Sequence, residues 1–127
     1  MRSIIASLSI LAAVALVAPA AWAPAAWAHA ALREASPAVG STVAKSPTEI
    51  SLKFSEGVEP ELSSITLSLK DGAKFATGKA GTGGKDKRFL TLKLPKALAP
   101  GAYTVHWAVV SIDSHKTEGS YSFEIKP

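Results

Sequence analysis

Residues 102–110 read AYTVHWAVV, and no other stretch of the chain shows its folding pattern more clearly. Apolar side chains occupy every second position, at Tyr103, Val105, Trp107 and Val109. Successive side chains of a β-strand point to opposite faces, so these four share one face and His106 lies on the other. The stretch therefore predicts a β-strand that is buried on one face only.

The same alternation occurs in four further short runs, at residues 50–54 (ISLKF), 65–69 (ITLSL), 90–94 (LTLKL) and 121–125 (YSFEI). Weaker strand candidates lie at residues 30–34 and around Phe75. Turn-forming dipeptides such as Ser-Pro, Asp-Gly and Pro-Gly separate the runs. These short strands share one apolar core, so we expect an all-β fold, either a seven-stranded Greek-key β-sandwich or a small barrel.

Two segments between the strands need a separate interpretation. No long segment after residue 28 has helical periodicity, and only residues 59–62 fit a single helical turn. The glycine-rich segment 78–84 lacks the Gly-Lys-Ser or Gly-Lys-Thr ending of a phosphate-binding loop. We therefore interpret it as a flexible connection between strands.

The composition limits the chemistry that the chain can perform. It has 127 residues, enough for one small domain, and no Cys, which excludes disulfides, zinc knuckles and thiol nucleophiles. The formal net charge is +4, but acidic and basic residues are interspersed. The densest basic cluster, residues 85–88, has little aromatic interleaving, so nucleic-acid binding is not expected.

The first 28 residues have the pattern of a secretory signal peptide, with Arg2, an apolar run from Ile4 to Ala18, and Ala26-Trp27-Ala28 as the cleavage site. The apolar run is about 15 residues, short of the roughly 20 that span a bilayer. An earlier Ala-x-Ala site is disfavoured because Pro24 would follow the cut. We expect residues 1–28 to be removed, residues 29–127 to form the mature domain, and the protein to be periplasmic.

Cleavage after Ala28 would make His29 the first residue, so that one residue offers a metal both its α-amine and its imidazole. Asp113 and His115 follow the strand of residues 102–110, and in an extended backbone both would point to one side. Three nitrogens and one oxygen suit a tetragonal Cu(II) site. Cu(I) is disfavoured because residues 29–127 contain neither Cys nor Met. Both features also have an ordinary explanation. Cleavage must expose some residue, so His29 could be first by coincidence, and Asp-x-His pairs occur often by chance.

The remaining histidine, His106, is expected to be a surface residue.

The chain resembles the CopC family of periplasmic copper-resistance proteins. The stretches that carry the resemblance are His29-Ala30, residues 36–41 (SPAVGS), 52–56 (LKFSE), 92–95 (LKLP), 101–115 (GAYTVHWAVVSIDSH) and 119–123 (GSYSF). The resemblance implies a cupredoxin-like or immunoglobulin-like sandwich with one Cu(II) per chain, held by His29, Asp113 and His115. It also implies that Glu56 does not bind copper itself but orients one of the ligating imidazoles or amines. Ser114 stands where Gly is common in the family, which should affect backbone freedom more than ligation.

The function expected from this resemblance is a monomeric Cu(II)-binding protein for copper resistance or homeostasis, not an enzyme. It would sequester copper or pass it to a membrane partner, and the family implies a CopD-like inner-membrane protein. One alternative is a small copper monooxygenase-like enzyme with an N-terminal histidine site. A domain of residues 29–127 leaves little chain for a flat polysaccharide-binding face, so no polysaccharide partner is expected. Another alternative is an adhesive or structural immunoglobulin-like module.

Overall fold

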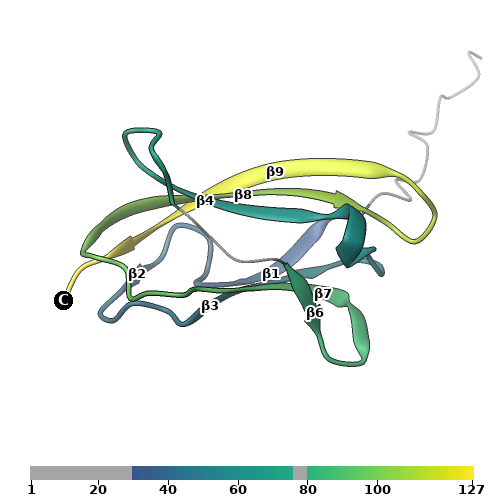
Figure 1. Ribbon diagram of the computed structural model, residues 1–127, viewed down its shortest axis with the longest axis horizontal. Helices are drawn as coiled ribbons and strands as arrows, with labels where there is room; N and C mark the ends of the chain where they lie inside the picture. Colours follow the sequence, from purple (N-terminus) through teal and green to yellow (C-terminus); the bar gives the residue numbers. More distant parts are fainter. Residues whose placement is uncertain (1–29, 76–79) are drawn as a thin grey trace, which may run out of the picture.

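The computed structural model describes residues 30–75 and 80–127, so the predicted signal peptide and His29 lie outside the described residues. The described chain folds into two stacked β-sheets (Figure 1). One sheet has the strand order β1-β3-β7-β6 and the other β2-β9-β8-β4-β5. The strands are β1 (Leu32–Ser36), β2 (Thr42–Val43), β3 (Glu49–Phe54), β4 (Ser64–Leu69), β5 (Lys74–Phe75), β6 (Gly81–Gly83), β7 (Asp86–Lys93), β8 (Gly101–Val110) and β9 (Lys116–Ile125).

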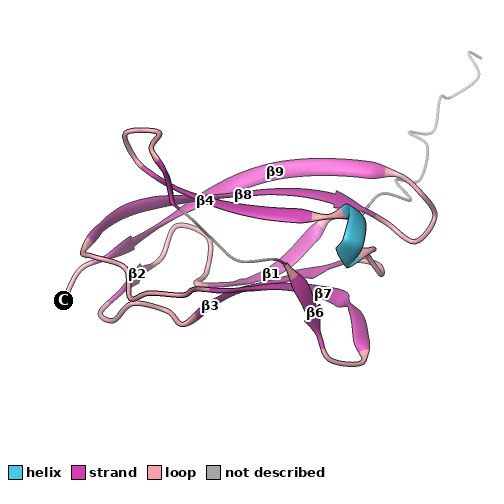
Figure 2. Cartoon of the chain, in the orientation of Figure 1, coloured by secondary structure: helices cyan, strands magenta, loops and turns pink. Residues whose placement is uncertain are grey.

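The all-β sandwich predicted from the sequence is confirmed, and each alternating run forms part of a strand, with Leu94 just beyond the end of β7. The predicted helical turn is the 3-10 helix η1 (Pro60–Leu62), the short helix in Figure 2. Two short strands, β2 and β6, were not predicted. The described residues include no helix long and apolar enough to span a membrane.

The glycine-rich segment was only partly interpreted correctly. Its residues Gly81–Gly83 form β6, an edge strand that pairs antiparallel with β7. Glycines have no side chains to alternate between apolar and polar, so their strand leaves no periodic pattern in the sequence. The equally short β2 pairs in parallel with the end of β9, through Thr42 opposite Glu124.

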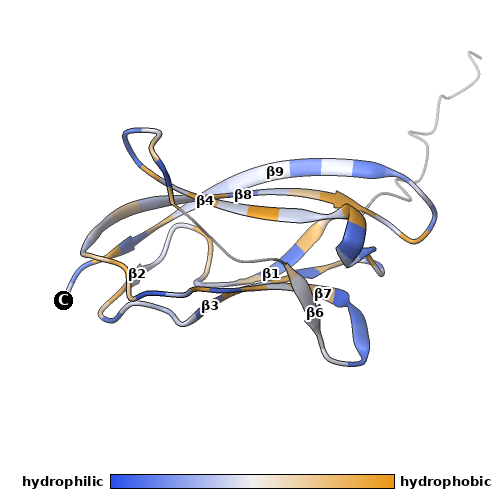
Figure 3. Ribbon diagram, viewed as in Figure 1, coloured by the Kyte–Doolittle hydropathy of each residue, from blue (hydrophilic) through white to orange (hydrophobic). Residues whose placement is uncertain are grey.

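The core lies between the sheets and is built from the predicted inward stripes, including Ile50, Leu67, Leu92, Val105 and Phe123. Figure 3 shows hydrophobic segments interspersed with hydrophilic ones along β1 and β4. On β8, Tyr103 and Val109 are buried whereas His106 is exposed, as the alternation predicted. Trp107 is only partly buried and packs against the core, with its ring centroid 6.1 Å from that of Phe54.

The Trp107 indole depends on a glycine across the β8–β9 ladder. Gly119 is the partner of Trp107 in the ladder, and a Cβ built on Gly119 would clash with the far edge of the indole ring. Because overpacking a fitted contact typically costs about 1–3 kcal/mol, Gly119→Ala should lower the free energy of unfolding by that amount. Urea unfolding followed by the fluorescence of Trp107, the only Trp in residues 29–127, measures the change.

Gly81→Ala is the matched control, because a Cβ built at Gly81 has no atom within 4 Å. It should leave stability unchanged or raise it slightly, since alanine restricts the unfolded chain more than glycine does. Equal losses in the two variants would contradict the role given to the Trp107–Gly119 contact.

Candidate metal centre

The connection between β8 and β9 is a tight loop, Ser111–His115, at the right-hand end of Figure 1, opposite the C-terminus. The Ser111 amide donates to the His115 carbonyl at 2.9 Å, and the Ser114 amide donates to the Ser111 carbonyl at 2.9 Å. A third amide, that of Ile112, donates to the Gly57 carbonyl at 3.0 Å. The loop is thus tied both to itself and to the segment that follows β3.

The loop brings Asp113 and His115 together. His115 Nδ1 lies 3.1 Å from Asp113 Oδ2, and the two side chains are 51% and 41% exposed. This proximity was predicted from an extended backbone. The predicted backbone is wrong, because the chain turns here. Ser114 has a φ of 72°, in the left-handed region that L-residues seldom occupy, and this turn places the flanking side chains on one side.

The Asp113 carboxylate accepts hydrogen bonds that favour its ionised form. The Ser111 hydroxyl donates to Oδ1, and this bond is the main cause that lowers the pKa of Asp113, followed by the interaction with His115. A metal therefore meets a carboxylate from which no proton must be displaced. The role of Ser111 was not predicted from the sequence. Ser111 occupies the next inward position after Val105 and Val109, where a polar residue is unexpected.

The start of the described chain lies at the same end of the sandwich. Ala30 is 2% exposed, and its carbonyl accepts a hydrogen bond from the Thr117 hydroxyl at 3.1 Å. Ala31 is bound to Ser55 through both backbone groups, because its amide donates to Ser55 Oγ at 2.9 Å and its carbonyl accepts from the Ser55 amide at 2.8 Å. Thr117 is two residues beyond His115, so the start of β9, which directly follows the candidate ligand, also holds the segment that comes after His29.

Glu56, the predicted orienting residue, comes directly after Ser55 and is partly buried. Its Oε1 atom is buried and has no hydrogen-bond partner among the described residues. Two residues later, Val58 forms an isolated β-bridge with Ser111. Glu56 therefore belongs to a segment that is fixed against the Asp113–His115 loop, and it retains one unsatisfied buried oxygen.

The described residues bring together two of the three predicted ligands, Asp113 and His115, and contain no cluster of three or more His, Cys, Asp or Glu side chains. His106 lies elsewhere, exposed on β8 and paired with Ser120. Four strand positions separate it from Val110 at the loop, a distance of about 13 Å.

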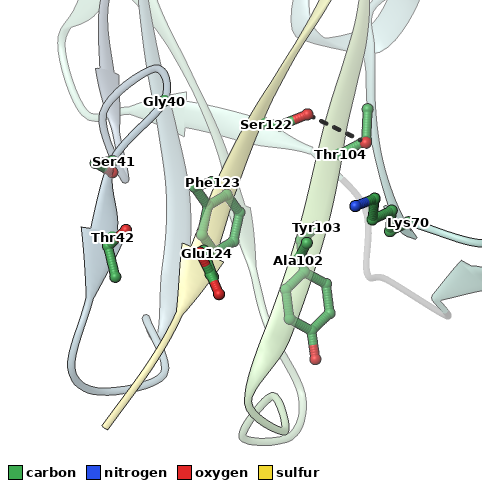
Figure 4. Close-up of a pocket in the computed structure, with 10 residues that line it drawn as sticks. All are labelled: Gly40, Ser41, Thr42, Lys70, Ala102, Tyr103, Thr104, Ser122, Phe123 and Glu124. Carbon is green, nitrogen blue, oxygen red and sulfur yellow. Dashed lines mark hydrogen bonds between the residues drawn. The ribbon is translucent and has the colours of Figure 1, made fainter.

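A surface hollow of about 290 Å³ lies on the sheet of β8 and β9, between Lys70 and the loop before β2 (Figure 4). Ala102 and Glu124, which line it, are eight ladder positions from the Asp113–His115 loop, about 26 Å away. The candidate ligands are therefore on an exposed rim and not in this hollow.

The left-handed backbone at Ser114 gives a testable prediction. This conformation costs an L-residue roughly 1–2 kcal/mol, whereas glycine adopts it freely but loses about 0.5–1 kcal/mol more conformational entropy on folding. Ser114→Gly should therefore leave the free energy of unfolding unchanged or raise it by up to ~1 kcal/mol. Ser120→Gly, on the exposed face of β9, should lower it by about 1 kcal/mol. Equal losses in urea unfolding would show that Ser114 is not strained.

Comparison with known proteins adds a family to this geometry. Residues 32–126 match the CopC domain model. The chain is 34% identical over 123 residues to "Copper resistance protein C" of Xanthomonas campestris pv. juglandis, covering 93% of this chain and 96% of that protein. It is 40% identical over 90 residues to "Protein YobA" of Escherichia coli K12, covering 71% of this chain and 73% of that protein.

Solved structures agree with the sequence relatives. The crystal structure of CopC from Methylosinus trichosporium OB3b superposes with a TM-score of 0.73 at 40% identity, covering 78% of this chain and 95% of that one. The structure of PcoC, described as a methionine-rich copper resistance protein from Escherichia coli, gives a TM-score of 0.69 at 31% identity, covering 78% and 100%. With its fold, its Asp-x-His loop and these relatives, the chain belongs to the CopC family of copper resistance proteins.

Proposed function

We propose that this protein binds one Cu(II) ion per chain in the periplasm, and either sequesters the copper or passes it to a membrane partner. The observation that carries the proposal is the meeting of two segments at one end of the sandwich. The Asp113–His115 loop is there, and so is Ala30, the residue that follows His29. Copper is the cargo of this site, and the protein acts as a carrier and not as an enzyme.

The donor atoms favour Cu(II) over other ions. Asp113 supplies an oxygen and His115 an imidazole nitrogen; His29, once cleavage frees it, would add its α-amine and its imidazole. Among divalent first-row metals such nitrogen and oxygen sites bind Cu(II) most strongly. Residues 29–127 have no sulfur ligand, in contrast to the relative described as methionine-rich, so Cu(I) should be held weakly.

The anchoring of Ala30 supports His29 as the third ligand residue. Consecutive Cα atoms are about 3.8 Å apart, so a residue bonded to Ala30 starts within a few ångströms of it. Ala30 is in turn held by Thr117, two residues from His115. A ligand placed at position 29 thus needs little chain to reach the loop, provided that the signal peptide has been removed.

The unsatisfied Glu56 oxygen supports its predicted role. A buried carboxylate oxygen without a partner is costly, and an α-amine or imidazole N–H would satisfy it. Carboxylates that accept such hydrogen bonds commonly orient metal ligands. We infer that Glu56 accepts a hydrogen bond from His29 and so holds it toward copper.

Hydrogen bonds of the protein itself hold the Asp113–His115 loop, which suits a carrier. The loop is closed by backbone hydrogen bonds, and the sandwich core is complete in the described chain. Loading and release of copper would therefore leave the fold intact. We propose a monomer whose exposed rim could meet a CopD-like inner-membrane protein.

The role of the α-amine gives the first prediction. A single Gly added before His29 converts the amine into an amide, which ligates only after losing a proton. One nitrogen donor is lost, so the Cu(II) affinity of the mature chain should fall tenfold or more, at least about 1.4 kcal/mol. Competition with a chelator of known affinity measures the change. Equal affinity for extended and authentic chains would exclude the α-amine as a ligand.

The histidines give the second prediction. His115→Ala removes a proposed ligand and should weaken Cu(II) binding more than about tenfold while changing the Cu(II) absorption spectrum. His106→Ala is the matched control, since His106 is an exposed histidine on the strand that leads to the loop. It should change neither quantity. A loss of affinity in His106→Ala as large as in His115→Ala would show that the ligand set is wrong.

A further inference from the structure

Ser111 is the one buried polar or charged residue among the described residues, with an exposure of 1%. Its hydroxyl lies within hydrogen-bond reach of three groups in the neighbouring loop. They are Asp113 Oδ1, the His115 amide at 3.3 Å and the His115 carbonyl at 3.2 Å. The side chain thus contacts both residues of the candidate metal pair.

A hydroxyl has one hydrogen to donate and lone pairs to accept, which decides how these contacts are used. A charged acceptor makes the stronger bond, so the hydroxyl hydrogen is donated to Asp113 Oδ1. The His115 amide then donates to the Ser111 oxygen. One hydroxyl therefore connects the Asp113 carboxylate to the His115 backbone.

Ser111 is itself held firmly. Its amide donates to the His115 carbonyl, its carbonyl accepts from the Ser114 amide, and it forms a β-bridge with Val58. The preceding residue, Val110, is fixed by its amide, which donates to Ser63 Oγ at 3.0 Å. The hydroxyl is therefore a fixed point to which the exposed Asp113 side chain is attached.

We propose that Ser111 is a positioning residue for copper, and that it fixes the orientation of the Asp113 carboxylate. The Ser111 hydroxyl holds Oδ1, which leaves Oδ2 on the side of His115, 3.1 Å from Nδ1. The inference rests on the proposed Cu(II) site and adds a residue that holds the Asp113 ligand through a hydrogen bond.

The fixed orientation has a consequence for binding. A carboxylate already held in one rotamer loses less conformational entropy when copper binds, so the affinity is higher. Ser111 thus contributes to copper affinity without touching the metal.

The test uses residues 29–127 with an authentic His29 terminus, and Cu(II) itself as the probe. Ser111→Ala should weaken Cu(II) binding about tenfold, the lower end of what loss of a ligand's hydrogen-bond partner costs. The electron paramagnetic resonance spectrum at saturating copper should also change. Ser122→Ala is the matched control because it removes another serine hydroxyl of the β8–β9 hairpin, one that lies beside Thr104 and away from the loop. It should alter neither the affinity nor the spectrum, and circular dichroism checks that both variants fold.

A double-mutant cycle shows whether Ser111 acts through Asp113. In an Asp113→Ala background the hydroxyl has no carboxylate to hold, so Ser111→Ala should lose most of its effect. An unchanged affinity and spectrum for Ser111→Ala, or an undiminished effect in the Asp113→Ala background, would overturn the inference. Failure of the unmodified chain to bind Cu(II) would instead contradict the proposed function, so the two failures are distinguishable.

Discussion

The antiparallel pairing of β8 with β9 is the constraint on which the candidate site depends. Ten residue pairs run from Gly101 opposite Ile125 to Val110 opposite Lys116, and this register closes the loop at Ser111 and His115. A shift by one residue would reverse which side chains face the core and would place different residues in the turn. The same register places Thr117 where its hydroxyl holds Ala30, so one hairpin organises both ends of the proposed copper site.

Within that hairpin, hydrogen bonds hold the candidate ligands Asp113 and His115 in place. The pKa of Asp113 is lowered because the Ser111 hydroxyl and His115 favour its charged form, so the carboxylate keeps its charge further into the acid range. The exposed residues Asp113 and His115 are hydrogen-bonded to the buried Ser111. The left-handed turn at Ser114 places both side chains on the same side of the loop. This combination of an open rim and a rigid support suits an ion that must enter and leave without unfolding the protein.

The sequence was sufficient where side chains alternate and insufficient where they do not. The stripe of Tyr103, Val105 and Val109 predicted β8 because burial on one face selects apolar residues at every second position. The strand Gly81–Gly83 escaped notice because glycine has no side chain to sort between faces. The Asp113–His115 pair was correctly predicted as neighbours, but from an extended backbone, since nothing in a single sequence marks a serine with a φ of 72°. Ser111 was missed because its role comes from contacts within the turn, although a polar residue at an inward position was a visible signal.

In the proposed site, His29 at the start of the mature chain and the Asp113–His115 loop hold one copper ion together. A crystal structure of residues 29–127 grown with Cu(II), with anomalous scattering recorded at the copper edge, tests it most directly. The account predicts one copper peak per chain, in contact with Asp113 Oδ2, a ring nitrogen of His115, and the amine and imidazole of His29. A copper peak bound by the loop without His29, or bound at His106, would contradict it.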